Sequence, residues 1–510
     1  MDYFRTKSMA DLRGEEGGLK RVLTATNLVL LGIGAIIGAG IFVLTGTAAA
    51  QYAGPGIVLS FCLAGLGCLF AGLCYAEFSS MIPVAGSAYT YGYATLGELV
   101  AWIIGWDLIL EYLFAASTVA VGWSGYFTAF MTNAGLELPP ALTGAPFSVE
   151  GTHTLVRSQI CIDPATSGVA VDAVSRTLIP AADCVAKGLT LTHGLVNLPA
   201  VALVLILTAL LVVGIKESAR FNNVVVFTKL AIVLLVIGFG FKYVNPANWT
   251  PFIPDNTGEI GRFGWSGVIR GAAVIFFAYI GFDAVSTAAQ EAKNPQKDLP
   301  IGMLGSLAIC TVLYILMALV MTGLAHYSEL NVPHPVFVAI EKAGPALGWL
   351  GLFVNIGAIA GLASVVLVML MGQPRIFYTM SRDGLLPPVF GKVHPKFGTP
   401  YVSTIVTGLV AAVIAGMFPI GLLGELVSIG TLLAFVIVCG GIIVLRRKQP
   451  DLPRPFRTPM VPLVPILGIL TCLGMMALLP GDTWLRLIIW LAIGLAIYFA
   501  YGRKHSVLNK

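Results

Sequence analysis

The sequence predicts an all-α integral membrane protein with twelve transmembrane helices, of which the first and the sixth are broken near their middle. Three observations support this fold class: an apolar composition, recurring spans of roughly 20 apolar residues, and glycine-containing breaks inside two of those spans. Of the 510 residues, 57% are hydrophobic and 11% are charged, and the mean hydropathy is +0.88. Soluble proteins carry about 25% charged residues, so we expect a lipid bilayer to cover this apolar surface.

The apolar segments divide the chain into four parts. They begin near residues 27, 56, 98, 195, 222, 266, 300, 347, 402, 421, 461 and 483. We predict a cytoplasmic N-terminal segment at 1–26, a membrane core at 27–446, two further helices at 447–502 and a cytoplasmic tail at 503–510. An even number of spans places both termini on one side of the membrane.

The distribution of Lys and Arg predicts which side that is. With the N-terminus inside, 21 of the 30 Lys and Arg residues fall in inner segments, 8 fall in outer segments, and Lys229 lies inside a span. Because cytoplasmic loops carry an excess of these residues, we expect cytoplasmic termini and a location in the cell (inner) membrane. The net charge of +5 is modest, and the basic residues are spread along the chain, which argues against a nucleic-acid partner.

The first span contains a glycine-rich run that disfavours a continuous helix. Its sequence is Gly32-Ile-Gly-Ala-Ile-Ile-Gly-Ala-Gly-Ile-Phe42. A glycine inside a helix costs about 1 kcal/mol relative to alanine, and open backbone in a membrane is tolerated only against protein or a water-filled cavity. We therefore predict a helix break at which a polar ligand binds, as in transporters with discontinuous helices.

The sixth span contains a second candidate break. The run Phe276-Phe-Ala-Tyr-Ile-Gly-Phe-Asp283 places Gly281 and Asp283 inside an apolar segment. The two breaks are five spans apart, which predicts that spans 1–5 and 6–10 form a five-plus-five inverted repeat, followed by two C-terminal helices. The alternative is that Gly281 only permits close helix packing.

Two broken helices would offer complementary backbone groups to one ligand. Free N–H groups in the first break, with a half-helix dipole behind them, attract an anion such as a carboxylate. We assign this role to Gly38, Ala39 and Gly40. Freed carbonyl groups accept hydrogen bonds from an ammonium group. The candidates for that role are Ile36, Phe277, Ala278 and Ile280. A ligand that carries both groups is an α-amino acid.

Ionisable residues inside the spans are functional candidates by default, because they are expensive in a membrane. Lys229 is either an amine that snorkels to the cytoplasmic interface or a buried amine that gains and loses a proton in each cycle. Glu111 falls near the membrane midplane and either hydrogen-bonds substrate or carries a proton, whereas Asp107 on the same helix face is also a candidate packing group. Asp283 either supports the open backbone or takes part directly in proton coupling.

Five stretches of the sequence resemble the amino acid–polyamine–organocation superfamily, and they are most similar to its cationic amino acid transporter family. They occur in the family's order over most of the membrane core, at Gly32–Phe42, Ile82–Tyr91, Gly105–Glu111, Phe276–Thr287 and Pro374–Pro387. The resemblance implies the five-plus-five inverted-repeat fold, alternating access and the backbone roles given above.

The resemblance also implies roles for individual side chains. It implies that Lys229 stands where sodium binds in sodium-coupled members, and that Glu111 is an acidic site residue on the third helix. Met369 occupies a position at which members that accept long cationic side chains are expected to carry a smaller residue. We therefore expect a shortened pocket that slightly favours small or neutral amino acids over cationic ones.

The longest predicted outer loop, 133–194, is longer than the resemblance leads us to expect, and we assign it no role. It contains Cys161 and Cys184. We predict a disulfide between them, because an oxidising compartment preserves such bonds. The alternative is two free thiols.

Together these observations predict a secondary active amino acid transporter, in the first place a proton symporter. A sodium-coupled symporter or an amino acid exchanger is the nearest alternative. The sequence has no His-Glu-x-x-His, Cys-x-x-Cys or P-loop pattern, so we expect no metal, no cofactor and no ATP hydrolysis. A channel is disfavoured because the ionisable residues are few and scattered. An intramembrane enzyme is disfavoured because no histidine lies deep in a predicted span to act as a base.

Overall fold

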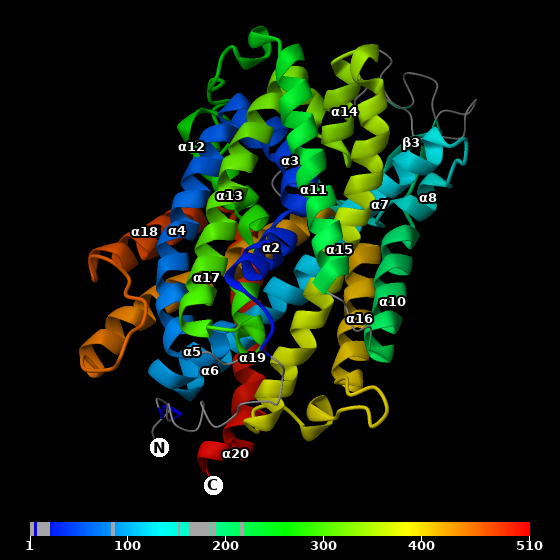
Figure 1. The fold of residues 1–510 in the computed structure, drawn as a ribbon. Coiled ribbons are helices and arrows are strands. Elements are labelled where there is room, and N and C mark those ends of the chain that lie inside the picture. Colours follow the sequence, from blue (N-terminus) through cyan, green and yellow to red (C-terminus); the bar gives the residue numbers. More distant parts are fainter. Residues whose placement is uncertain are drawn as a thin grey trace.

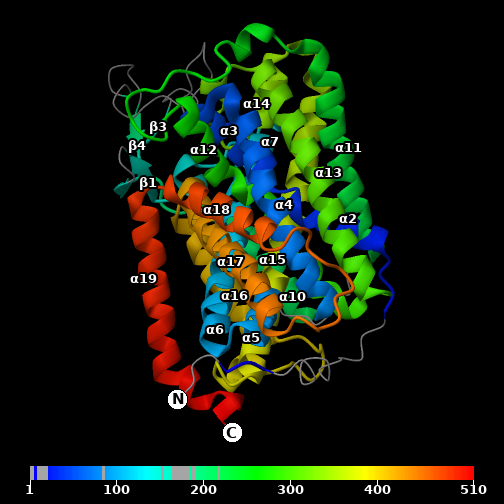
Figure 2. The same ribbon diagram turned by 90° about the vertical axis from the view of Figure 1, so that its left-hand side faces the viewer.

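The computed structural model describes residues 5–7, 21–82, 87–150, 154–162, 184, 190–214 and 219–509. These residues form an elongated bundle of helices, with the N- and C-terminal ends of the chain at the same end of the bundle (Figures 1 and 2). The two terminal segments are in contact, because the Arg5 guanidinium donates a hydrogen bond of 2.6 Å to the carbonyl of Leu508. The opposite end carries short strands and loops.

The helices follow the apolar segments of the sequence. The α-helices are α2 (Ala25–Ile36), α3 (Thr45–Ala48), α4 (Ile57–Met81), α5 (Ser87–Thr95), α6 (Glu98–Ile109), α7 (Ala115–Asn133), α8 (Pro140–Thr143), α10 (Leu198–Val213), α11 (Ala219–Gly240), α12 (Gly264–Ile275), α13 (Pro295–Leu324), α14 (Pro335–Lys342), α15 (Gly348–Arg382), α16 (Tyr401–Met417), α17 (Ile420–Lys448), α18 (Leu463–Ala477), α19 (Gly481–Ile497) and α20 (Arg503–His505). π-Helical turns at Gly40–Leu44, Ala49–Ala53, Leu110–Phe114 and Tyr498–Gly502 continue several of them.

Eight helical stretches among the described residues are long and apolar enough to cross a membrane. They are Gly40–Met81, Glu98–Asn133, Val224–Tyr243, Gly264–Ser286, Pro295–Leu324, Pro345–Arg382, Ile420–Lys448 and Gly481–His505. Four further apolar helices, α2, α10, α16 and α18, are shorter. An all-α membrane protein is therefore confirmed. Every predicted apolar segment coincides with helix, but twelve crossings and the inverted repeat stay predictions.

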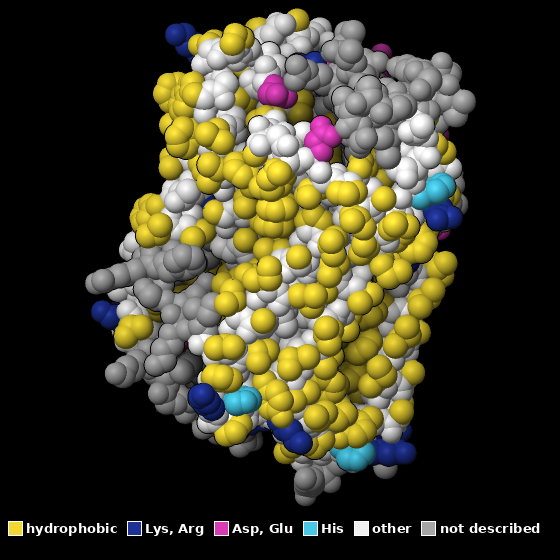
Figure 3. All heavy atoms as spheres, turned by 90° about the vertical axis from the view of Figure 1, so that its right-hand side faces the viewer, with side chains coloured by type: hydrophobic (Ala, Val, Ile, Leu, Met, Phe, Trp, Pro, Cys, Tyr) yellow, Lys and Arg dark blue, Asp and Glu magenta, His cyan; other side chains and the backbone are white. Residues whose placement is uncertain are grey.

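Helices distant in sequence pack closely. α13 packs against α2 and α4, α15 packs against α7, and α10 packs against α16. One face of the bundle is largely apolar: in Figure 3, hydrophobic side chains cover most of its middle, and charged side chains lie toward its upper and lower ends. This is the distribution expected of a surface in contact with lipid.

Short strands occupy part of the loop between α7 and α10. β1 (Phe147–Glu150) pairs with β2 (Thr154–Arg157), and β3 (Ile160–Ile162) pairs with β4 (Thr190–Thr192), both antiparallel. The Cα atoms of Cys161 on β3 and Cys184 lie 5.7 Å apart, a separation that disulfides adopt. The disulfide between them stays a prediction.

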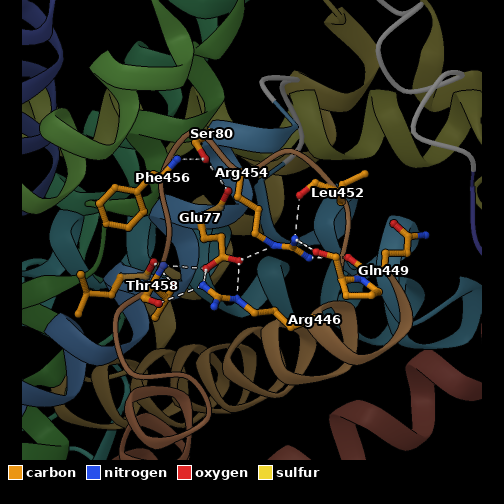
Figure 4. A network of polar contacts seen from close by, with 10 residues as sticks. Glu77, Ser80, Arg446, Gln449, Leu452, Arg454, Phe456 and Thr458 are labelled. Atoms are coloured by element: carbon orange, nitrogen blue, oxygen red, sulfur yellow. Dashed lines mark hydrogen bonds and ion pairs between the residues drawn. The ribbon is translucent and has the colours of Figure 1, made fainter.

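A buried ion-pair network joins α4 to the end of α17. Glu77 on α4 is fully buried and accepts two hydrogen bonds from Arg446, at 3.0 and 2.7 Å, and one from the backbone of Thr458 at 2.8 Å. Arg454 forms a second ion pair with Glu77 at 3.2 Å. Figure 4 shows the two arginines reaching the carboxylate from different parts of the chain. The network therefore fixes the segment after α17 onto α4.

Candidate functional site

The first helix is broken where the glycine run predicts. α2 ends at Ile36, and Ile37 has an extended backbone with φ −71° and ψ 97°. The helix resumes as a π-helical turn at Gly40–Leu44. The chain between these two points has left the regular hydrogen-bond pattern of an α-helix, so backbone groups become available for other partners.

The sixth helix is broken as well. α12 ends at Ile275 and continues as a tight 3₁₀ turn at Phe276–Tyr279. Ile280 then has an extended backbone, and Gly281 has a φ of +113°. A positive φ is a conformation that glycine adopts without strain. Gly281 is therefore required by the break itself, and the alternative that it only permits helix packing is wrong.

The two breaks lie directly against each other. A Cβ atom built on Gly40 would lie only 2.3 Å from the Cα of Ala278, and one built on Gly281 would lie 3.1 Å from the carbonyl carbon of Ala35. Glycine at these positions allows the two backbones to approach more closely than any side chain permits. Each break therefore forms one wall of the same site.

Tyr314 on α13 connects the two breaks. Its hydroxyl lies 2.8 Å from the carbonyl oxygen of Ile36 and 2.9 Å from that of Ala278. The carbonyl of Phe277 accepts a hydrogen bond from the N–H of Ile280 at 3.2 Å. Three of the four carbonyls that we expect to bind an ammonium group therefore already have a partner. A carbonyl oxygen has two lone pairs, so each can still accept a second donor.

A small closed cavity lies between the breaks. Its volume is about 10 Å³, roughly the space that one water molecule needs. Its lining includes seven of the predicted substrate residues, namely Ile36, Gly38, Ala39, Gly40, Phe277, Ile280 and Met369. Ala278 and Glu111 are not part of this lining. Ala278 instead packs against Gly40.

The remaining residues that line the cavity were not predicted, because no sequence pattern marks them. They are Ala35 on α2, Ala115 and Val119 on α7, and Val365 on α15. Apolar residues on a membrane helix look alike in sequence whether they face lipid, protein or a cavity. Among the described residues, no charged side chain lines this cavity. The cavity therefore places apolar side chains beside the polar backbone of the breaks.

Lys229 points into the first break. Its side chain is fully buried, and its amine donates hydrogen bonds to the carbonyls of Gly34 at 2.8 Å and Ile37 at 3.2 Å. A snorkelling lysine is therefore excluded. Its stem packs against Gly361 of α15, where an added Cβ would lie 3.1 Å from the lysine Cγ. The amine thus occupies a position between backbone carbonyls that suits a small cation.

Glu111 and Asp283 form a buried acidic pair beside the cavity. Glu111 lies in the π-helical turn at Leu110–Phe114 and is 1% exposed. Its carboxyl group faces those of Asp283 and, at longer range, Asp107. The hydroxyl of Tyr112 lies 3.4 Å from Asp283 Oδ2. The predicted proton-coupling residues Glu111 and Asp283 are therefore brought together, whereas Lys229 binds the other side of the first break.

The histidines that the structure describes lie in loops or at the end of a helix, as the sequence indicates. His334 precedes α14 and lies beside Tyr126, with ring centroids 6.3 Å apart. Burial lowers the pKa of His334 to about 4, because desolvation disfavours the charged ring. This ring is therefore neutral at physiological pH.

The chain is similar in sequence to known transport proteins. A family model described as "Amino acid permease" matches residues 23–498. The chain is 47% identical to the methylthioribose transporter of Bacillus subtilis and 49% identical to the branched-chain amino acid permease BcaP of the same organism, over 99% of each chain. It is 36% identical to the vacuolar cationic amino acid transporter 4 of Arabidopsis thaliana, over 85% of this chain and 64% of that protein.

Proposed function

The chain belongs to the amino acid permease family of the amino acid–polyamine–organocation superfamily, and from that premise we propose that it transports neutral, apolar α-amino acids by proton symport. The observation that carries this proposal is the closed cavity between the two breaks, which combines open backbone with an apolar lining. Such a transporter is not an enzyme: it moves its substrate across the membrane without changing it.

The backbone of the breaks supports recognition of the amino and carboxyl groups. The segment Gly38–Gly40 borders the cavity and precedes a helical turn, so its N–H groups suit the substrate carboxylate. The carbonyls of Ile36 and Ile280 border the same cavity from the two breaks and suit the ammonium group. This mode of binding uses what all α-amino acids share.

The side chains of the cavity support selectivity for apolar substrates. Phe277, Val119, Val365 and Met369 line the cavity, and we propose that the substrate side chain packs against them once the helices move. A guanidinium or ammonium group would be desolvated there without an ionic partner, which is costly. Two of the similar proteins are named branched-chain amino acid permeases. We therefore propose leucine, isoleucine and valine as the preferred substrates.

The environment of Lys229 supports proton coupling over sodium coupling. Its amine lies between the carbonyls of Gly34 and Ile37, so it fills a position that a sodium ion would need. When the amine is protonated, it holds the two carbonyls of the first break together. When it is neutral, this attraction is weaker, so the break can change shape. Glu111 and Asp283 can share a further proton beside the cavity.

A second candidate function comes from the relative that is named a methylthioribose transporter. A methylthio sugar offers an apolar methylthio group to the cavity, but it has no carboxylate for the N–H groups of Gly38–Gly40 and no ammonium group for the carbonyls. For that reason we rank amino acids first. Competition between the two ligands separates the alternatives.

The test is exchange of labelled leucine in proteoliposomes that contain unlabelled leucine. We expect isoleucine and valine to compete strongly and arginine weakly. Leucinamide, which lacks the carboxylate, and 4-methylpentanoate, which lacks the ammonium group, should compete poorly. The proposal is wrong if leucine does not exchange while labelled methylthioribose does, or if arginine competes better than isoleucine.

A further inference from the structure

A second, much larger cavity opens at the end of the bundle opposite the termini. Its volume is about 1170 Å³. On each of two helices, a residue that lines the large cavity lies about one turn from a residue that lines the closed cavity. On α7, Gly122 lines the large cavity and Val119 lines the closed one. On the first helix, Val43 lines the large cavity and Gly40 lines the closed one. Three residues of helix span about 4.5 Å.

Two buried side chains of opposite charge line this cavity. Arg270 on α12 is 8% exposed, and Glu425 on α17 is 5% exposed. Buried charges are costly unless a partner of opposite charge is present. The guanidinium of Arg270 lies 4.5 Å from the centre of the Tyr52 ring. Glu425 accepts a hydrogen bond from Thr483 at 2.9 Å. Both charges are therefore held in place by neighbours that are themselves fixed in the fold.

The two charges lie at the same level on adjacent helices. The Ser428 hydroxyl of α17 lies 3.5 Å from the carbonyl of Val274 on α12. Arg270 precedes Val274 by one turn, and Glu425 precedes Ser428 by three residues, so both lie on the outer side of this contact. Tyr52, Arg270 and Glu425 all line the large cavity. The three residues thus form one cluster on the wall of the cavity.

This cluster complements a zwitterion. A guanidinium binds a carboxylate through charge-assisted hydrogen bonds, and a carboxylate binds an ammonium group in the same way. Arg270 precedes Phe277 by seven residues, or about 10 Å along a helix, so the cluster lies on the way to the closed cavity. The closed cavity of about 10 Å³ cannot admit an amino acid until the helices move, whereas the large one already can.

We propose that the wall formed by Tyr52, Arg270 and Glu425 is a second binding site for zwitterionic α-amino acids, in which Arg270 binds the carboxylate and Glu425 binds the ammonium group. Substrate is held there before it enters the site between the breaks. This proposal rests on the proposed function, because both sites take the same substrate. The competing explanation is that the two charges only pair with each other and join α12 to α17.

The test counts labelled leucine bound at saturation to the purified full-length protein in lipid nanodiscs. We expect two molecules per chain for the unaltered protein. Arg270→Gln and Glu425→Gln should each reduce this number to one. Arg270→Lys should bind more than one molecule per chain but fewer than two, because the cation is retained. Gly40→Ala, which disturbs the site between the breaks, should also leave one. Glu259→Gln, which alters an exposed charge on the same cavity, should leave two.

The outcomes separate this proposal from the proposed function. One molecule per unaltered chain, together with leucine exchange in proteoliposomes, overturns the second site and leaves the function standing. Two molecules in both Arg270→Gln and Glu425→Gln overturn the assignment of these residues. The absence of both binding and exchange overturns the function and this proposal together. The count on the unaltered protein needs no variant, so a variant that fails to fold does not leave the proposal undecided.

Discussion

At the scale of single residues, we propose that Met369 limits the length of the substrate side chain. It is buried on α15 and lines the cavity beside Val365. A smaller side chain there leaves room for a longer substrate side chain. Pocket contacts of this size change discrimination by about 1–3 kcal/mol, so Met369→Ala should improve competition by arginine about tenfold.

The measurement for Met369→Ala is the concentration of arginine that halves leucine exchange. Met317→Ala is the matched control, because Met317 is a fully buried methionine on α13 that does not line the cavity. The Met317→Ala substitution removes the same side-chain volume at another position in the core. If both variants leave competition by arginine unchanged, Met369 does not set selectivity.

The residues that could be predicted are those whose type conflicts with their surroundings. Lys229, Glu111 and Asp283 are ionisable residues in apolar spans, and the structure buries all three next to the breaks. Val119 and Val365 could not be predicted, since a valine that faces a cavity does not differ in sequence from one that faces lipid. The contact of Tyr314 with both breaks was hardly predictable, because its only mark in the sequence is a polar hydroxyl inside a long apolar helix.

At the scale of secondary-structure elements, the two broken helices pack against each other. They approach closely where Gly40 meets Ala278. Gly40→Ala places a methyl group against the backbone of Ala278, and overpacking of this kind typically costs about 1–3 kcal/mol. We expect leucine affinity to fall by about tenfold or more, as measured by saturation binding. Gly238→Ala on α11 is the control, because nothing lies within 4 Å of the added atom. Equal affinities for the two variants would mean that the crossing of the breaks does not shape the site.

The Glu77 network holds two distant elements together. Glu77→Gln leaves Arg446 and Arg454 without their carboxylate partner, and breaking a buried ion pair typically costs about 3–5 kcal/mol. We expect a clear fall in the thermal unfolding midpoint in detergent. Glu259→Gln breaks the exposed ion pair with Arg262, which is typically worth under about 1 kcal/mol. A similar midpoint for both variants would show that the network does not stabilise the fold.

The existence and order of the elements could be predicted, but not their connections. Apolar runs of about 20 residues fix where helices lie, and Gly281 fixes where the sixth helix opens. The contact of Glu77 with Arg446 joins residues 369 positions apart. No local pattern encodes such a contact. The π-helical turn that carries Glu111 is likewise set by packing against neighbouring helices.

The whole molecule is open at one end and closed at the other. The large cavity is lined in part by Thr143 of α8 and Phe147 of β1, and α8 lies away from the end that carries the termini (Figure 1). At the terminal end, Lys7 forms an ion pair of 2.9 Å with Asp383, which also accepts a hydrogen bond from Tyr89 at 2.7 Å. If the termini are cytoplasmic, as the distribution of Lys and Arg predicts, this conformation is accessible from the outside. Substrate then reaches the breaks through the large cavity.

The central claim is that an amino acid binds between two broken helices and that a proton on Lys229 controls the first of them. The measurement is leucine uptake into proteoliposomes under an imposed pH gradient or an imposed sodium gradient, for the unaltered protein, Lys229→Ala and the exposed control Lys242→Ala. We predict uptake driven by an inward proton gradient but not by sodium. Lys229→Ala should lose this driven uptake and keep exchange, whereas Lys242→Ala should keep both. Uptake driven by sodium alone, or undiminished driven uptake in Lys229→Ala, would contradict the account.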